Sequence, residues 1–314
     1  MSPRPLVSVI MSVFNERPEY LELAVDSILG QTYDHLEFLI MDDGSGPETA
    51  AALKAVARRD GRIRLLRQEN AGLTRSLNRL IGQTQGGFIA RQDSDDISEP
   101  ERLERQVSFF ASHPEVMLLG TGALLIDPQG NVLYRQRVRT NPRPLRRRLR
   151  RANQFAHGSV MFRAQVFNED LYYEEYRYAE DYDLFLRISE HHPIANLDLP
   201  LYRYRINPLS ISMAKAHQQS FMGMIVREAG RRRRKGLERR WSQETYDEIA
   251  VLLNTPRHHR RLEGHVCTTQ GRNLLLLGRK AEAHGMFWRA LTACPSPRGL
   301  WYLLRSFLPG RVVG

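Results

Sequence analysis

The first 112 residues alternate between short apolar runs and amphipathic segments. Runs typical of buried strands lie at Leu6–Val13, Leu36–Met41, 62–66 and 87–91. Apolar residues recur at helical spacing from Pro18 to Gly30, over 47–59 and 71–83, and again from Pro100. Strands and helices in this order predict an α/β fold, with a mixed, mostly parallel sheet and helices on both faces.

The second half of the chain changes from a mixed to a purely helical pattern. Further strands are predicted at 116–126, 132–138 and Ser159–Phe162, with a basic helix or loop at Arg143–Arg151 and a helix at Tyr182–Ser189. From about Lys215 the helical segments are 242–253, 259–277, 279–292 and 298–307. Gly271–Ala293 resembles a tetratricopeptide hairpin, which cannot bury its apolar face alone. We therefore predict an α/β domain at 1–214 and a basic α-helical region at 215–314.

The composition is that of an ordinary globular protein, with 42% hydrophobic and 26% charged residues among 314. Two cysteines are too few for a disulfide scaffold or a cysteine-rich zinc site. No apolar run reaches the roughly 18 residues of a membrane-spanning helix, and the N-terminal segment lacks a signal-peptide pattern. We expect a cytoplasmic protein, with peripheral attachment to the inner face of the membrane as one option.

The net charge of +11 is unevenly divided, because acidic residues predominate in 1–130 and basic residues in 131–314. The run Arg231–Lys235 leaves three interpretations open: a solvated helix face, contact with an anionic membrane surface, or binding of nucleic acid. Apolar residues near the C-terminus suit an interfacial helix; they are Trp301, Leu303, Leu304, Phe307 and Leu308. Nucleic acid is the least favoured partner, because no recognised binding module surrounds the run.

Polar clusters follow three of the predicted strands: Ser12–Glu16, Asp42–Ser45 and Asp93–Asp95. Ligands of open parallel sheets bind beyond the carboxyl ends of the strands, so these clusters should share one crevice. Several carboxylates crowded together are unfavourable unless a cation occupies the site. Asp93 and Asp95 suit Mg²⁺ or Mn²⁺ held together with substrate phosphates. An isolated Asp-x-Asp would more often be a solvated turn before a helix, but three neighbouring acidic ends favour the metal.

Six segments, in this order, resemble family 2 glycosyltransferases: VSVIMSVFNE, EFLIMDDGS, NAGLTRSLNRLI, GFIARQDSDDISEPERL, AHGSVMFR and YAEDYDLFLRI. The resemblance spans about residues 5–212. It implies a GT-A fold, to which the helical pattern of residues 215–314 adds a C-terminal α-helical region. It also implies inverting transfer of a sugar from a nucleotide-diphospho-sugar, with Mn²⁺ or Mg²⁺ as the cofactor.

For the sugar donor, the resemblance implies that Phe14 stacks on the base, with Ser12, Asn15 and Glu16 beside it. Asp43 would accept the imide N–H of the base, which favours uracil or thymine.

Nearer the diphosphate, the resemblance implies that Asp93 lies beside the ribose and diphosphate and that Asp95 is the direct metal ligand. Arg75 falls where the family has a basic residue near the nucleotide, although a surface arginine is an equal alternative. Arg205 is a diphosphate candidate, and Asn207 stands where the family often has His, which puts a metal role for Asn207 in doubt.

The acceptor hydroxyl must lose a proton as it attacks, which calls for one carboxylate as general base. Asp181 matches the family's base, with Glu180 in a supporting role. His157 aligns with a position on the acceptor side, although a lone His is more often structural.

The expected function is single-sugar transfer, with a UDP-sugar preferred over dTDP- and GDP-sugars and a polysaccharide or lipid-linked acceptor. The Gln-x-x-Arg-Trp motif of the processive members is absent. A nucleotidyltransferase is the alternative on fold grounds, but no glycine-rich loop follows the first strand, and a dinucleotide oxidoreductase lacks support for the same reason. A basic nucleic-acid- or membrane-binding protein without catalysis is the alternative from another class.

Overall fold

The structure is a computed structural model that describes residues 4–169, 171–206, 215–237 and 240–307. The chain forms two compact units. The first comprises residues 1–124, 135–175 and 183–204, and the second comprises 125–134, 176–182 and 205–314. The domain boundary that we predict at residue 214 lies outside the described residues.

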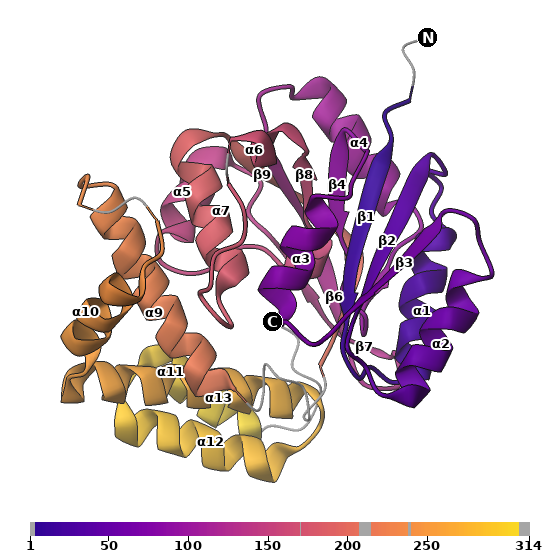
Figure 1. The fold of residues 1–314 in the computed structure, drawn as a ribbon. Helices are drawn as coiled ribbons and strands as arrows, with labels where there is room; N and C mark the ends of the chain where they lie inside the picture. Colours follow the sequence, from indigo (N-terminus) through magenta and orange to yellow (C-terminus); the bar gives the residue numbers. More distant parts are fainter. Residues whose placement is uncertain (1–3, 170, 207–214, 238–239, 308–314) are drawn as a thin grey trace. The chain divides into compact units, whose positions relative to one another are not determined.

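The predicted strands and helices of the first 136 residues are present (Figure 1). They are β1 (Val7–Val13), α1 (Pro18–Leu29), β2 (Leu36–Asp43), α2 (Pro47–Ala57), β3 (Ile63–Gln68), α3 (Leu73–Ile81), β4 (Phe88–Arg91), α4 (Arg102–Ser112), β6 (Leu118–Ile126) and β7 (Val132–Gln136). Proline at the first helical position of α1 and α2 suits a residue that has no N–H to leave unsatisfied.

The next part of the chain contains α5 (Pro142–Leu149), a 3₁₀-helix at His157–Ser159, β8 (Met161–Arg163) and α7 (Glu180–His191). Besides the 3₁₀-helix, three elements were not predicted: β5 (Ile97–Ser98), α6 (Gln165–Asn168) and β9 (Ile194–Arg205). The strand β9 contains Asp198 and Pro200, residues that disfavour a strand when only the sequence is considered.

The strands form one sheet in the order β3-β2-β1-β4-β8-β6-β9-β5, with β7 paired to β6. The pairs β1–β2, β2–β3 and β1–β4 are parallel, whereas β4–β8, β6–β8 and β5–β9 are antiparallel. Alternate residues of β1 (Val7, Val9, Met11 and Val13) pack into one core cluster with side chains of α1, α2 and α4. The helix α3 contacts β1 and β2 but contributes nothing to that cluster, so helices cover both faces, as predicted.

The C-terminal helices are α9 (Ala216–Arg233), α10 (Gln243–Leu253), α11 (Pro256–Leu276), α12 (Lys280–Ala293) and α13 (Pro297–Phe307). The helices α11 and α12 pack closely as the predicted hairpin. Glycine at position 271 makes this possible, because a Cβ there would lie only 2.6 Å from the Phe287 ring. A small core joins them to α13 through Phe287 and Leu303. Within the described ranges, no helix combines the length and the apolar character needed to cross a membrane.

Candidate active site

The loops after β1, β2 and β4 are joined to one another by hydrogen bonds. The three strands are parallel neighbours, so their carboxyl ends lie at the same edge of the sheet. The Asn15 backbone N–H donates to Ser45 Oγ (3.1 Å), and the Gly46 N–H donates to Asn15 Oδ1 (2.8 Å). Ser94 Oγ donates to Glu16 Oε2 (3.2 Å), which connects the Asp-x-Asp loop to the end of β1. The structure therefore brings together the three polar clusters that the sequence places at strand ends.

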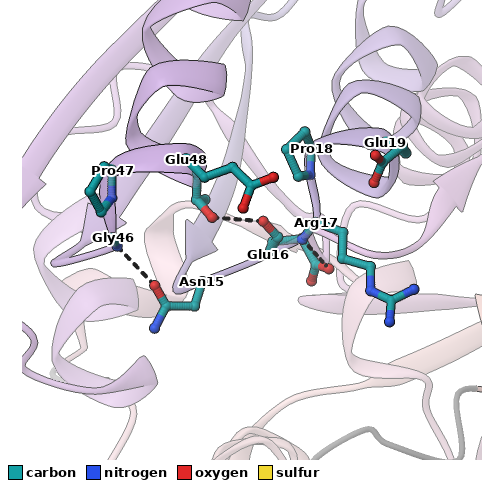
Figure 2. Close-up of a pocket in the computed structure, with 9 residues that line it drawn as sticks. Asn15, Glu16, Arg17, Pro18, Glu19, Gly46, Pro47 and Glu48 are labelled. Atoms are coloured by element: carbon teal, nitrogen blue, oxygen red, sulfur yellow. Dashed lines mark hydrogen bonds between the residues drawn. The ribbon is translucent and has the colours of Figure 1, made fainter.

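A cavity of about 580 Å³ lies beside these loops, between the first turns of α1 and α2 (Figure 2). It is lined by Asn15–Glu19 and Gly46–Thr49. Thr49 Oγ1 donates to the Glu16 carbonyl (2.7 Å) and thereby ties the two walls together. Two helices begin here, so the positive ends of two helix dipoles lie at the cavity. Of the residues predicted to bind the donor, Asn15 and Glu16 line this cavity.

Phe14 and Ser12, the other two residues near the end of β1 that were predicted to bind the donor, differ in exposure. The Phe14 side chain is 53% exposed, so an aromatic face is open at the edge of the sheet. Ser12 is half-buried within β1, opposite Met41 in the register with β2. An exposed aromatic ring beside polar groups is suited to stacking on a nucleobase.

Asp43 is almost fully buried, at 2% exposure, and its carboxylate holds the loop before α3. Oδ1 accepts from Gln68 Nε2 (2.6 Å) and the Ala71 N–H (2.9 Å). Oδ2 accepts from the Gly72 N–H (2.9 Å) and Asn70 Nδ2 (3.3 Å). A carboxylate offers about four acceptor positions. A base N–H would therefore have to replace one of these donors, of which Asn70 Nδ2 is the most distant.

Asp93 contacts a buried network of arginines and a tyrosine that the sequence pattern does not predict. Arg91 is 1% exposed, and its Nη2 donates to Asp93 Oδ1 (2.7 Å). The Asp93 N–H donates to Tyr202 Oη (3.2 Å). Arg102 Nη1 donates to the Arg91 carbonyl (2.9 Å) and the Gly158 carbonyl (2.6 Å). Burial lowers the pKa of Arg102 to about 10 and raises the pKa of Tyr202 well above its usual value. Asp93 is thus held directly by Arg91 and Tyr202, and Arg102 in turn holds the backbone of Arg91.

The Asp-x-Asp pair offers oxygen ligands of the kind that Mg²⁺ and Mn²⁺ prefer. Asp95 is half-buried in the turn after β4, and one oxygen of Asp93 is already bound by Arg91. In the part of the chain that the structure describes, no three His, Cys, Asp or Glu side chains gather as a metal-binding group. A hard cation held by one or two carboxylates and by phosphate oxygens of a substrate needs no such cluster, so the donor set fits.

His157 is linked to α3 through Tyr173. Its Nε2 lies 2.9 Å from Tyr173 Oη. The Tyr173 backbone exchanges two hydrogen bonds with the Asn78 side chain, at 2.9 and 3.0 Å. Burial, and then the positive charge of Arg91, lowers the pKa of His157 to about 3. The imidazole is therefore neutral near neutral pH. Arg75, also on α3, forms an exposed ion pair with Glu175 (3.2 Å).

The residues predicted for catalysis open the helix α7. Glu180 is its first residue and is buried, and Asp181 follows and is half-buried. Residues 176–182 group with the second unit. One turn further along the same helix, Asp183 forms a buried ion pair with Arg187 (2.7 Å).

Arg205 is 3% exposed, and its Nη1 donates to the carbonyls of Asp127 (3.2 Å) and Pro128 (2.9 Å). These contacts hold the turn between β6 and β7, and a diphosphate role for Arg205 stays a prediction. Asn207 lies outside the described residues.

Some of the missed residues had a recognisable signal. Arg91 is a charged residue at the end of an otherwise apolar strand, and a buried charge requires a partner. Tyr202 and Tyr173 had none, because both act across long sequence separations.

Comparison with known proteins identifies the family. The profile of the family described as "Glycosyl transferase family 2" matches residues 8–174, which is more than half of the chain. The chain belongs to this family. It is therefore a glycosyltransferase, as the six sequence segments predict, and the nucleotidyltransferase and non-catalytic alternatives are set aside.

Two relatives share about a third of their residues with this glycosyltransferase. It is 36% identical over 206 residues to the amylovoran biosynthesis glycosyltransferase AmsE of Erwinia amylovora, covering 64% of this chain and 76% of the relative. It is 34% identical over 206 residues to the O-antigen biosynthesis glycosyltransferase WbnJ of Escherichia coli, covering 64% and 80%.

Solved structures share the fold at low sequence identity. S. aureus TarS 1-349 in complex with UDP-GlcNAc has a TM-score of 0.58 at 16% identity, covering 91% of this chain and 88% of that chain. The mannosyltransferase PcManGT from Pyrobaculum calidifontis, in complex with GDP-Man and Mn²⁺, has a TM-score of 0.56 at 17% identity, covering 97% and 80%. The predicted GT-A fold is confirmed, and one of these neighbours, PcManGT, was solved with Mn²⁺.

Proposed function

We propose that this glycosyltransferase transfers one sugar, with inversion, from a nucleotide-diphospho-sugar to a hydroxyl group of a polysaccharide or lipid-linked acceptor. The observation that supports this most strongly is the set of hydrogen bonds that joins the loops after β1, β2 and β4. These bonds gather an exposed aromatic ring, a buried carboxylate and the Asp-x-Asp pair along one edge of the sheet. A base, a diphosphate and a metal ion require that combination of groups.

The base stacks on Phe14, and its imide N–H reaches Asp43 by replacing the long contact from Asn70 Nδ2. This exchange favours uracil over adenine and cytosine, which carry no ring N–H in their usual tautomers. TarS binds UDP-GlcNAc and PcManGT binds GDP-Man, so the fold itself accepts either base. The Asp43 contact and stacking on Phe14 support a base with a ring N–H, and of the two we expect the UDP-sugar.

Asp95, assisted by Asp93, holds the divalent ion together with the phosphate oxygens of the donor. When bound, the ion neutralises the charge that develops on the nucleoside diphosphate as it leaves. Arg91 keeps one oxygen of Asp93 engaged, so Asp95 would be the direct ligand and Asp93 would lie toward the ribose side. Arg75, which forms an exposed ion pair with Glu175, supplies a further positive charge for the diphosphate.

Asp181 accepts the proton of the acceptor hydroxyl as that oxygen attacks the anomeric carbon, and Glu180 supports it. The bond to the diphosphate oxygen breaks on the opposite face of the sugar, so the configuration inverts. His157 stays neutral and lies on the acceptor side, where its ring can hydrogen-bond a hydroxyl. The names of two relatives support this acceptor class, since AmsE is named for amylovoran biosynthesis and WbnJ for O-antigen biosynthesis. Work on such acceptors would place the enzyme at the cytoplasmic face of the membrane.

The test is a panel of nucleotide sugars, assayed for ligand-dependent thermal stabilisation and for nucleoside diphosphate release, with and without Mn²⁺. A bound donor raises the melting temperature in proportion to the logarithm of its concentration over its dissociation constant. We expect stabilisation by a UDP-sugar only with the metal. Asp95→Asn should lose that stabilisation, whereas Asp181→Asn should keep it and lose turnover.

The matched control is Asp26→Asn, which removes an exposed carboxylate of α1 that pairs with Arg59. This variant should behave as the wild type does. Wild-type turnover by Asp181→Asn would exclude Asp181 as the base. Metal-independent stabilisation by every nucleotide alike would contradict the donor site as a whole.

A further inference from the structure

A second cavity, of about 270 Å³, lies among the C-terminal helices, entirely within the second unit. Its polar lining consists mainly of arginines, a histidine and hydroxyl groups; the residues used below are Arg261, His265, Thr268, Arg272, Ser296 and Arg298. No carboxylate lines it. The cavity plays no part in the proposed sugar transfer.

The geometry of α11 explains why these side chains gather. Residues 261, 265, 268 and 272 are three or four positions apart, so they share one face of the helix. Gly264 lies beside this face, and a Cβ there would come within 2.8 Å of Cys294 Cβ, so α11 closely approaches the end of α12. The next helix, α13, begins at the same place, with the Gly299 N–H donating to Ser296 Oγ (3.0 Å). The arginine face therefore adjoins the positive end of a helix dipole.

The positive charge of this cavity is not compensated by the described residues. Arg261, Arg272 and Arg298 form no ion pair with any carboxylate in the described ranges. The Nε of Arg272 is buried without a hydrogen-bond partner among those residues. Desolvation, and then the charges of Arg227, Arg298 and Arg272, lowers the pKa of His265. The positive charges of three arginines thus act on this ring.

Arginines of the basic run at 231–235, in the same unit, do form ion pairs with described residues, unlike those that line the cavity. Arg231 and Arg232 both pair with Glu228, and Arg232 also pairs with Glu248 (2.7 Å). Arginines that are neutralised in this way bind an external anion less strongly, because the existing ion pair must first be broken. The densest basic run of the sequence is therefore a weaker candidate for an anion site than the cavity.

The residues beside the cavity indicate where its anion comes from. On α13, Trp301 lies one turn after Arg298 and is 44% exposed. Leu304 and Phe307 continue the exposed apolar surface, at 58% and 67%. A free phosphate ion would leave these side chains in water, whereas a lipid headgroup would bring the membrane interface to them. Basic groups flanked by Trp, Leu and Phe on one helix are typical of interfacial attachment.

We propose that this cavity binds the phosphate of an anionic lipid headgroup and so docks α13 on the membrane surface. Arg272 and Arg298 provide the charge-assisted hydrogen bonds to the phosphate oxygens, and Arg261 completes the cationic lining. The Ser296 hydroxyl, whose oxygen accepts from the helix, still has its own proton to donate. The apolar side chains of α13 enter the interface beside the bound headgroup.

The test is co-sedimentation of the full-length protein with phosphatidylcholine vesicles that contain or lack phosphatidic acid. We expect binding only to the vesicles with phosphatidic acid, and we expect it to weaken with salt. Arg272→Gln and Arg298→Gln should each weaken it about a hundredfold, since each loses a charge-assisted hydrogen bond together with a surface charge. Arg298 is exposed, so its variant should fold even if Arg272→Gln does not.

Arg257→Gln is the matched control, because Arg257 is an exposed arginine of the same helix that does not line the cavity. It should weaken binding only about fivefold or less, through the loss of general surface charge. Equal losses for all three variants would overturn the proposal, since binding would then be diffuse. Absence of vesicle binding would overturn it too, including the case in which the protein binds inorganic phosphate but not the vesicles.

Discussion

Gly158 is the position where a single added methyl group should disturb the candidate site most. A Cβ there would lie 1.8 Å from Tyr202 Oη and 2.6 Å from Asp93 Oδ2, both shorter than real Cβ contacts allow. Tyr202 is fully buried and cannot move aside freely. Gly158→Ala should therefore cost about 1–3 kcal/mol through overpacking. Loss of the Asp93–Tyr202 hydrogen bond should add about 1 kcal/mol.

Urea denaturation measures this change, because the midpoint falls with stability while the slope stays constant if only stability has changed. Gly285→Ala is the control, since Gly285 lies in the exposed middle of α12 with nothing within 4 Å of an added Cβ. That variant should gain about 0.5–1 kcal/mol. If Gly158→Ala kept the wild-type midpoint, the close packing of Gly158 against Tyr202 and Asp93 would be refuted.

Two further predictions concern buried ionisable groups. Burial lowers the pKa of His157 to about 3. Below about pH 6.5 this imidazole is therefore protonated in the unfolded chain but stays neutral in the native state. Stability is therefore lost as the pH falls from 6.5 towards 3, by up to about 1.4 kcal/mol per pH unit. In His157→Gln the urea midpoint should depend less on pH between 6.5 and 5 than it does in the wild type. The same dependence of the midpoint on pH in both proteins would contradict this. Asp183→Asn should cost about 3–5 kcal/mol, because it leaves the buried Arg187 without its close carboxylate. Glu101→Gln, which breaks the exposed pair with Arg105, should cost about 1 kcal/mol or less, and similar losses for the two variants would be the contrary result.

The part of the fold that the sequence predicts best is the part where local pattern and tertiary environment agree. Continuous apolar runs identify β1 and β2 because both faces of these strands are buried. The strand β9 escaped prediction because it is only partly buried and contains a proline and an aspartate. Its pairing depends on residues far away in the chain, such as those of β5. Local propensity carries no information about such partners.

The candidate site divides in the same way. The sequence places Asn15, Glu16 and the Asp-x-Asp loop at neighbouring strand ends, and hydrogen bonds join them there. The network around Asp93 could not be predicted as a group, since Arg91, Arg102 and Tyr202 come together only in the tertiary fold. The full engagement of Asp43 by the loop before α3 was equally invisible, because it depends on backbone N–H groups that every sequence possesses.

The central claim is that the loops after β1, β2 and β4 form one site for a nucleotide-sugar. A crystal structure of the protein with UDP and Mn²⁺ tests it most directly. The account predicts the uracil ring against Phe14 with its N–H toward Asp43, and the ion between Asp95 and the diphosphate. A nucleotide bound elsewhere on the protein, or an ion that does not contact Asp95, would contradict it.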